Sequence, residues 1–376
     1  MKERGNRLLK KLDVFAGIPI VFILGLLKKI FGRKVNCSPD NKKTLTIGVL
    51  KEAAIGDLVV LSGVLKDIEK WAPEARLILC CSKENFALTN LLDLNLNVEV
   101  IVLPMSKPLE LFKRVLSLPE MDLWMDFGQW PRINAIISFL VKAKCKLGFK
   151  TPGQFRHYVY DIAISHSGDR HEIENYREFL RALKIPAGSL PALKIIPKSI
   201  ELSKKFVIFH MFPGGARSYL RVWDKRYWME LGRFFLERNY AIALTGGKMD
   251  FQEAEEFKIE LEGFNISNSI VINGAGKWSL EETVFAISKA VLVVSVATSI
   301  VHLAAAINAN LIGLYGPTSS ERWGPLGKKS RVISPLLDCS PCLNLGFESR
   351  CKDNKCMKMI KVEDVIKAAK SLVPDL

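Results

Sequence analysis

Short apolar runs alternate with amphipathic stretches along most of the chain after residue 44. The runs have the length of buried strands, and the stretches between them place apolar residues at helical spacing. After the first run, apolar residues recur at i, i+3, i+4 and i+7, namely at Leu61, Val64, Leu65 and Ile68. Strands that alternate with helices predict a parallel, doubly wound α/β sheet. The strands predicted in the first half of the chain are residues 46–50, 77–81, 98–103 and 123–127.

The same alternation returns in the second half and predicts a second domain of the same class. Its predicted strands are residues 206–210, 240–245, 270–272, 292–295 and 311–315, and an amphipathic helix over residues 362–372 closes the chain. Between the halves, residues 186–198 contain Pro186, Pro191 and Pro197 and show no clear period, which is typical of a linker. We therefore predict domains at residues 44–186 and 199–376.

The first 34 residues differ from the rest because an uncharged run is flanked by basic clusters. The run is VFAGIPIVFILGLL, residues 14–27, and nine Lys and Arg against Glu3 and Asp13 give residues 1–34 a charge of +7, out of +15 for the chain. Crossing a bilayer takes about 20 apolar residues and Pro19 interrupts the run, so we do not expect a simple transmembrane helix. The run ends in Leu-Leu-Lys-Lys-Ile-Phe rather than in small residues, which argues against a cleaved signal peptide.

We predict that residues 1–34 form a retained, membrane-associating segment on the cytoplasmic side. Its apolar side chains would enter the acyl boundary while Lys and Arg contact anionic headgroups. A buried core helix and an atypical start-stop signal are the alternatives.

Composition narrows the remaining possibilities. A chain of 376 residues with 49% hydrophobic and 25% charged residues is typical of a globular protein with two domains. Its net charge of +15 suits nucleic acid, a membrane surface or anionic small molecules. The basic residues lack interleaved aromatic residues or a known binding motif, so we do not expect a nucleic-acid partner.

The eight cysteines fall into two sets. We expect the scattered set to be free buried thiols, as is usual in a reducing compartment; it consists of Cys37, Cys80, Cys81 and Cys145. The second set has the spacing C-x2-C-x8-C-x4-C within residues 339–356, and its members are Cys339, Cys342, Cys351 and Cys356. Four thiolates at this spacing could hold a structural zinc ion, and free thiols or disulfides are the alternatives.

Two strand-to-helix turns carry polar residues at the carboxyl ends of strands, where open α/β sheets bind ligands. Asp57 follows Gly56 at such a turn and, taken alone, is most simply a helix N-cap. In the second half, the strand at residues 292–295 leads into a helix that opens at Thr298 or Ser299, with His302 one turn on. Free N–H groups at such a helix start suit a phosphate group. Taken alone, a histidine on an apolar helix is more often a core residue.

Together, several segments resemble the heptosyltransferase-type glycosyltransferases, the family that builds the inner core of bacterial lipopolysaccharide. The segments are Ile55-Gly56-Asp57, Pro213-Gly214 with Arg221-Val222-Trp223, Leu244-Thr245-Gly246-Gly247, and Thr298 to His302 with Tyr315-Gly316-Pro317-Thr318. They occur in the family's order over residues 44 to 370. The resemblance implies a GT-B fold, in which two Rossmann-like domains face each other across a cleft.

The resemblance also implies the reaction. A heptose or related sugar would move from an ADP-heptose-like donor to a lipid-linked saccharide at the cytoplasmic face of the inner membrane, with inversion. Asp57 would be the general base, and Arg221 stands where the family has a phosphate-binding lysine. The implied donor-binding residues are Gly214, Gly215, Arg217, Arg221, Thr298, Ser299, His302, Gly316, Pro317 and Thr318.

The chain departs from the family at Ala297-Thr298-Ser299, where an acidic residue, Ser or Thr, and glycine are usual. The lost carboxylate leaves a second function open, that of a non-catalytic nucleotide-sugar-binding protein. We expect metal-independent chemistry, because the histidines lack ligand spacing and no paired-carboxylate motif is present. Candidate acceptor residues, each of which could instead be a capping or surface residue, are Asp126, Gln129, Arg132, His171, Glu172, Asn175 and Tyr176.

Overall fold

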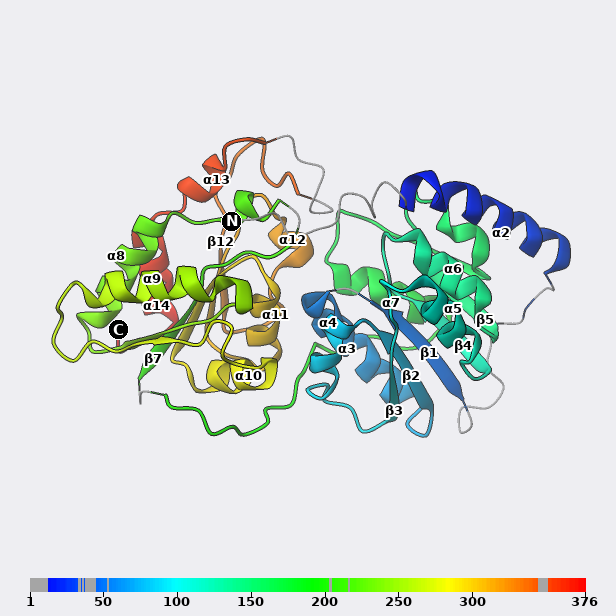
Figure 1. Ribbon diagram of the computed structural model, residues 1–376, viewed down its shortest axis with the longest axis horizontal. Helices are drawn as coiled ribbons and strands as arrows, with labels where there is room; N and C mark the ends of the chain where they lie inside the picture. The colour runs from blue at the N-terminus through cyan, green and yellow to red at the C-terminus, as the bar shows by residue number, and fades with distance from the viewer. Residues whose placement is uncertain are drawn as a thin grey trace. The chain divides into compact units, whose positions relative to one another are not determined.

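The computed structural model describes residues 13–32, 35, 37, 45–52, 54–202, 205–215, 217–343 and 351–376. The chain forms two compact units that divide between Pro191 and Ala192. Each unit is built on a six-stranded parallel sheet (Figure 1). The division falls inside residues 186–198, the stretch that the proline pattern indicated as a linker.

The first unit has the strand order β3-β2-β1-β4-β5-β6. The strand order reverses between β1 and β4, and this is the point at which doubly wound sheets bind ligands. The strands are β1 (Thr46–Lys51), β2 (Arg76–Cys81), β3 (Asn97–Val102), β4 (Met121–Asp126), β5 (Ala143–Lys150) and β6 (Ile162–Ser165). The helices are α2 (Gly17–Phe31), α3 (Ile55–Trp71), α4 (Lys83–Thr89), α5 (Pro108–Leu116), α6 (Arg132–Leu140), η1 (Arg156–Val159) and α7 (Glu172–Ala182).

The second unit repeats this topology with the order β12-β11-β10-β7-β8-β9, so its reversal lies between β7 and β10. The strands are β7 (Phe206–His210), β8 (Ala241–Leu244), β9 (Val271–Asn273), β10 (Leu292–Val296), β11 (Leu311–Leu314) and β12 (Ser330–Ile333). The helices are η2 (Ser218–Arg221), α8 (Lys225–Leu236), η3 (Lys248–Asp250), α9 (Phe251–Glu262), α10 (Leu280–Lys289), α11 (Ser299–Ala306), α12 (Ser320–Trp323), α13 (Lys355–Lys358) and α14 (Val362–Leu372).

Central strands buried on both faces hold each unit together. Every residue of β7 and of β10 is buried, as expected for a parallel sheet covered by helices on both sides. Aromatic side chains fill the second core, where Trp228 packs against Phe209 with ring centroids 5.1 Å apart and against Trp223 at 5.0 Å. The prediction of two doubly wound domains is confirmed.

The N-terminal helix corrects two sequence-based interpretations. Pro19 does not interrupt α2, because it lies in the first turn, where proline's missing N–H is tolerated. The alternative of a buried core helix is also wrong, since only 11% of the apolar window in Asp13–Phe31 is buried. By length and composition alone this helix could cross a membrane.

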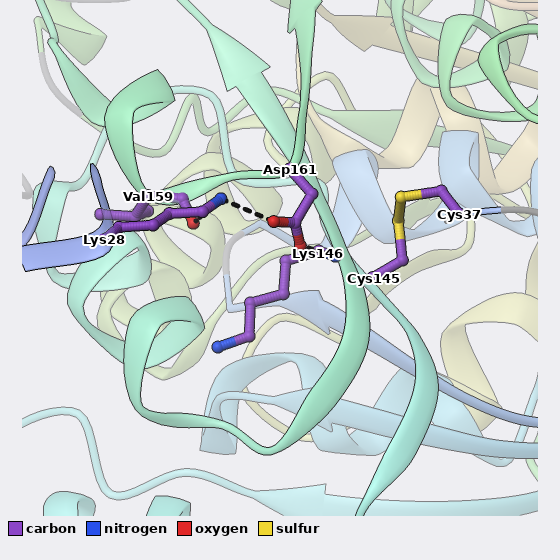
Figure 2. Close-up of a disulfide and its surroundings, with 6 residues drawn as sticks. All are labelled: Lys28, Cys37, Cys145, Lys146, Val159 and Asp161. Carbon is purple, nitrogen blue, oxygen red and sulfur yellow. Dashed lines mark hydrogen bonds and ion pairs between the residues drawn. A yellow bond between two sulfur atoms is a disulfide. The ribbon is translucent and has the colours of Figure 1, made fainter. Parts of the chain in front are cut away.

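Cysteine pairing is a further correction (Figure 2). Cys37 and Cys145 form a disulfide with a Cα–Cα distance of 5.2 Å, so the prediction of free thiols is wrong for this pair. The two residues are 108 positions apart, and only the fold brings Cys37 beside β5. Cys80 and Cys81 are free and buried as predicted. Burial raises the pKa of Cys80 to about 12 and that of Cys81 to about 11, so both stay neutral thiols.

Candidate functional site

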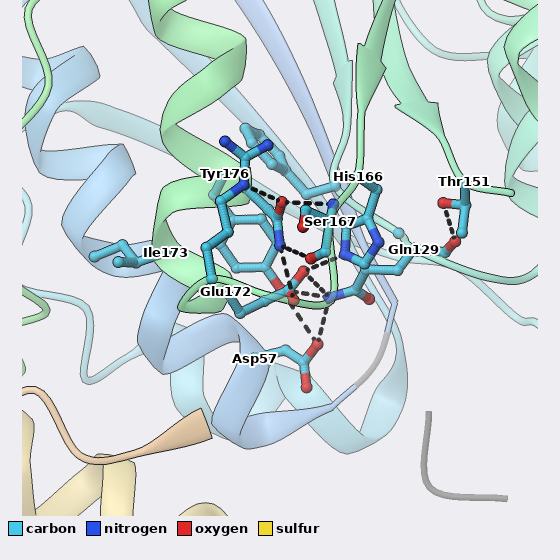
Figure 3. A network of polar contacts seen from close by, with 12 residues as sticks. Asp57, Gln129, Thr151, His166, Ser167, Glu172, Ile173 and Tyr176 are labelled. Carbon is cyan, nitrogen blue, oxygen red and sulfur yellow. Dashed lines mark hydrogen bonds and ion pairs between the residues drawn. The ribbon is translucent and has the colours of Figure 1, made fainter. Parts of the chain in front are cut away.

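Asp57 lies at the reversal point of the first sheet, at the start of the helix that follows β1. It is the third residue of α3, whose N-cap is Ala54, so the interpretation of Asp57 as an N-cap is wrong. Its side chain is 20% exposed and turns toward other side chains (Figure 3). The Asp57 carboxylate therefore interacts with side chains from other parts of the fold.

The two oxygens of Asp57 differ in their surroundings. Oδ1 lies 2.9 Å from the ammonium of Lys51, accepts a hydrogen bond from Gln129 Nε2 at 3.1 Å, and accepts another from the Tyr176 hydroxyl at 3.2 Å. Oδ2 has no hydrogen-bond partner among the described residues. Figure 3 shows it directed away from the polar network. One oxygen is thus held in place while the other stays available to a proton donor.

Lys51 is the residue that the sequence analysis did not single out. It ends β1 with a side chain that is 0% exposed. Its ammonium donates to the carbonyl of Phe127 at 3.1 Å and to Gln129 Oε1 at 3.1 Å, besides pairing with Asp57. A lysine has three N–H donors, so all are used and the buried charge is paired. The signal in the sequence was a lysine at the end of an otherwise apolar strand.

A second layer of buried groups supports this cluster. Glu172 is fully buried, and its Oε1 accepts from Gln129 Nε2 at 2.9 Å and lies 2.9 Å from His166 Nε2. Its Oε2 accepts from the side-chain amide of Asn175 at 3.3 Å. The fold therefore gathers four of the seven candidate acceptor residues around Asp57, which are Gln129, Glu172, Asn175 and Tyr176.

The other three candidates have structural partners elsewhere in this unit. Asp126 is fully buried, pairs with Arg156 at 2.5 Å and accepts from the Tyr160 hydroxyl at 2.6 Å. Arg132 pairs with Asp13 at 2.7 Å. His171 is the N-cap of α7, and its Nδ1 accepts from the backbone N–H of Ile173 at 3.2 Å.

In the second unit, the predicted phosphate-binding helix start is formed. Thr298 is the N-cap of α11, and its hydroxyl accepts from the backbone N–H of Ile300 at 3.3 Å. Ser299 begins the helix, and His302 is largely buried with its ring edge-on to Trp323 at 6.2 Å. The α11 N-terminus presents a partial positive charge at the carboxyl end of β10.

Arg221 is brought to the same place by η2. Its guanidinium donates to the carbonyl of Gly214 and, at 3.5 Å, to that of Ala297, which directly precedes the N-cap of α11. Burial lowers the pKa of Arg221 from its usual value. Gly215 and Arg217 both adopt positive φ, at 81° and 49°, so the loop is tightly turned. Arg221 thus contacts both the Pro213-Gly214 loop and the residue that precedes the α11 N-cap.

The cysteine-rich segment lies against the third predicted donor loop. The carbonyl of Pro317 accepts from the N–H groups of Cys342 and Leu343 at 2.9 and 2.8 Å. Thr318 forms an isolated parallel β-bridge with Leu343. Added bulk at Gly316 would come within 2.9 Å of the Cys356 sulfur. The loop at residues 316–318 is therefore in contact with Cys342, Leu343 and Cys356.

The cysteines themselves are close enough to influence one another. Burial raises the pKa of Cys356, and the neighbouring Cys342, Cys351 and Cys339 raise it further. Among the described residues, no group of three or more His, Cys, Asp or Glu is arranged to hold a metal ion. A zinc ion bound by Cys339, Cys342, Cys351 and Cys356 stays a prediction.

Curated proteins similar to this chain are heptosyltransferases. Lipooligosaccharide heptosyltransferase 2 of Haemophilus influenzae is 32% identical over 148 residues, which are 39% of this chain and 42% of that protein. In three such matches this chain spans 36 to 42% of the relative's length. Lipooligosaccharide heptosyltransferase 2 of Campylobacter jejuni is 26% identical over 332 residues, 85% of this chain and 95% of that protein.

Solved structures agree on the fold. The ADP-heptose LPS heptosyltransferase II of Escherichia coli has a TM-score of 0.69 at 17% identity, over 88% of this chain and 99% of that chain. This likeness and the two matching sheets confirm the predicted GT-B type of fold. The family described as "Glycosyltransferase family 9 (heptosyltransferase)" matches residues 133–351, which is more than half of the sequence. The chain therefore belongs to glycosyltransferase family 9, the heptosyltransferase family.

Proposed function

We propose that this protein is a glycosyltransferase that moves a heptose or a related sugar from an ADP-heptose-like donor to a lipid-linked saccharide of the lipopolysaccharide core. Family membership and the names of the similar proteins support the class of reaction. The observation that carries the proposal is Asp57, a carboxylate held by three donors at Oδ1 with Oδ2 left available.

In the proposed reaction, Asp57 is the general base. Oδ2 takes the proton from an acceptor hydroxyl as the hydroxyl oxygen forms a bond to the anomeric carbon of the donor sugar. The bond from that carbon to the nucleotide diphosphate breaks on the opposite face, so the configuration inverts. The diphosphate leaves with the electron pair of the broken bond and needs nearby positive charge.

The second unit supplies that charge. Backbone N–H groups at the start of α11 carry partial positive charge, and the guanidinium of Arg221 carries a full positive charge beside them. Such groups stabilise developing negative charge in a transition state. Ala297 in place of the usual carboxylate keeps the second hypothesis, a nucleotide-sugar-binding protein without catalysis, as an outcome of the test.

The proposed location is the cytoplasmic face of a bacterial inner membrane, with peripheral attachment. The basic first 34 residues and the exposed apolar side chains of α2 support this location. Both substrates would be anionic, in keeping with the net charge of +15.

Donor binding and transfer should be measured separately. In a thermal-unfolding panel of ADP-, UDP- and GDP-linked sugars, we expect ADP-heptose to stabilise the protein most, by about 2.7 kcal/mol at a hundred times its dissociation constant. We then expect transfer to an inner-core lipopolysaccharide acceptor, followed as release of the nucleotide. Binding without transfer to any acceptor would establish the non-catalytic hypothesis, and no stabilisation by any nucleotide sugar would refute both.

A further inference from the structure

The α2 helix is fastened to the first unit along one narrow side. Gly17, Val21, Gly25 and Lys28 follow one another along that side. A Cβ at Gly17 would lie 3.0 Å from Arg132 and one at Gly25 would lie 2.5 Å from Tyr158, so the helix backbone lies directly on α6 and η1. Val21 is fully buried in a small cluster with Ala135, Val159 and Tyr160. Figure 1 shows the helix running alongside α6.

Ion pairs tie both ends of this helical segment to the same unit. At its start, Asp13 pairs with Arg132 at 2.7 Å and accepts from the Arg132 backbone N–H at 2.7 Å. Near its end, Lys28 pairs with Asp161 at 2.8 Å and donates to the carbonyl of Val159 at 3.2 Å (Figure 2). Just beyond the helix, Cys37 also lies beside Cys145 of β5, with a Cα–Cα distance of 5.2 Å.

The opposite side of the helix is apolar and exposed. Ile23, Leu26 and Ile30 share that side at helical spacing and are 58%, 58% and 61% exposed, and Phe15 and Phe31 at the two ends of the helical segment are 78% and 76% exposed. A contiguous apolar surface of this kind marks an interaction site in a folded protein. Since the other side of the helix is docked on its own domain, the exposed side needs a separate partner.

We propose that α2 lies in the plane of an anionic lipid leaflet and inserts this exposed side into it, while its docked side holds the first unit at the membrane surface. The inference deepens the membrane location within the proposed function. The charge of +7 over residues 1–34 complements anionic headgroups, and Asp13, the acidic residue of the helical segment, is already paired with Arg132.

The two ion pairs argue against a transmembrane orientation. The segment Asp13–Phe31 is long enough to cross, but a crossing helix would carry its two ends to opposite sides of a hydrocarbon core about 30 Å thick. Arg132 and Asp161 belong to one folded unit and hold both ends on one side. Crossing would break both pairs and remove Val21 from its buried cluster.

This arrangement connects the membrane to the Asp57 cluster. Arg132 begins α6 only three residues after Gln129, whose amide donates to Asp57. One short segment therefore joins the lipid-facing helix to the proposed base, as suits an acceptor sugar carried on a lipid.

The first test uses the full-length protein and vesicles with and without phosphatidylglycerol. Changing Leu26→Glu and Ile30→Glu together should lower the vesicle-bound to free ratio about tenfold or more, because carboxylates resist transfer into the acyl boundary. The matched control is Leu109→Glu on α5, which replaces another exposed leucine of the same unit (80% exposed) and should bind as the wild type does. Unchanged vesicle binding by the double variant overturns the proposal. The proposal also fails if the wild type is a dimer in solution and the double variant disrupts that dimer but still binds vesicles.

The second test determines the orientation. A protease-cleavable tag is placed ahead of Met1 and another after Leu376, and sealed inner-membrane vesicles of known sidedness are digested. We expect both tags to be cleaved from the same side, whereas cleavage from opposite sides overturns the in-plane orientation. Neither readout needs activity, so a protein that binds vesicles as expected but transfers no sugar would refute only the proposed function.

Discussion

The unequal environments of the two Asp57 oxygens give the sharpest test of the proposed chemistry. Asp57→Asn keeps the size of the side chain but removes its basicity. We expect turnover to fall by about 10²-fold or more, the scale of losing a general base, with donor affinity within a few-fold of the wild type. Steady-state kinetics and equilibrium donor binding together check this. Wild-type turnover in Asp57→Asn would remove Asp57 from the mechanism.

Lys51 positions Asp57 without any route to the substrate of its own, because all three of its N–H donors are used inside the protein. Lys51→Met should lower kcat by about tenfold to a hundredfold and leave the donor dissociation constant unchanged. It should also destabilise the fold by about 3 kcal/mol or more, since it breaks a buried ion pair. Lys66→Met is the matched control, because Lys66 forms a partly exposed pair with Glu69 worth about 1 kcal/mol or less. A loss of stability with unchanged kcat would make Lys51 purely structural.

Arg221 is the residue-scale test of the second unit. Arg221→Ala should weaken donor binding about tenfold to a hundredfold, which corresponds to losing a charge-assisted contact of about 1.5 to 3 kcal/mol. Arg233→Ala on α8 removes a surface pair with Glu237 and should leave binding unchanged. Titration calorimetry with ADP-heptose measures both variants, and equal affinity in all three proteins would show that Arg221 only braces its loop.

At this scale the sequence located residues that belong to spaced motifs. Asp57, Thr298 and Arg221 could be found because each stands beside glycine, tryptophan or histidine at a recognisable distance. Lys51 stands out locally only as a lysine at the end of an apolar strand, and its partners Phe127 and Gln129 are 76 and 78 residues away. The Cys37–Cys145 disulfide was not predicted either, because its two cysteines are 108 residues apart. Contacts between distant segments are properties of the fold and leave no local pattern.

At the scale of elements, strands buried on both faces were the easiest to predict. Each strand predicted from the hydrophobic pattern is present, with ends that differ by at most two residues. Three strands, β5, β6 and β12, were not predicted, because β5 interleaves lysines with apolar residues and β6 and β12 are partly exposed edge strands. A partly solvated strand contains polar residues and therefore lacks the continuous apolar run from which the other strands were predicted.

Lys146 on β5 should make the stability of the protein depend on pH. Burial lowers the pKa of Lys146 to about 8, beside the Lys28–Asp161 pair that anchors α2. The folded protein therefore holds this proton less tightly than the unfolded chain, whose lysines titrate near 10.4. The resulting penalty is complete below about pH 8 and vanishes as the pH rises toward the unfolded value.

Lys146→Met should therefore raise the free energy of unfolding by about 1 to 3 kcal/mol at pH 7, and the gain should fall by about half or more by pH 9.5. Lys144→Met, two residues earlier on the same strand and 67% exposed, is the control and should change stability by about 1 kcal/mol or less at both values. Denaturant unfolding at the two pH values measures both. A gain that does not depend on pH would mean that packing, rather than the buried charge, is responsible.

At the scale of the whole molecule, two sheets of one topology place different side chains at their reversal points. In the first unit, the paired Asp57 carboxylate lies in the first turn of α3, after β1. In the second unit, the α11 N-terminus follows β10, and Arg221 donates to the carbonyl of Ala297 beside it. The fold class followed from the alternation of strands and helices, and the family resemblance implied a base in the first unit and donor-binding residues in the second. The partners of these side chains could not be predicted, because they depend on which distant segments gather at each reversal point.

If the base and the donor-binding groups lie on separate units, the affinity for the donor should not depend on Asp57. If the second unit alone supplies the groups that hold the diphosphate, Arg221→Ala should weaken donor binding by the same factor in wild-type protein and in Asp57→Asn. Changes at independent sites add to within about 0.3 to 0.5 kcal/mol, so the coupling free energy should lie inside that range. Calorimetry on the four proteins, with donor and without acceptor, gives the cycle directly and avoids turnover. A coupling of about 1 kcal/mol or more would mean that Asp57 contacts the bound donor, and its proposed role would then have to include orienting the sugar as well as removing the acceptor proton.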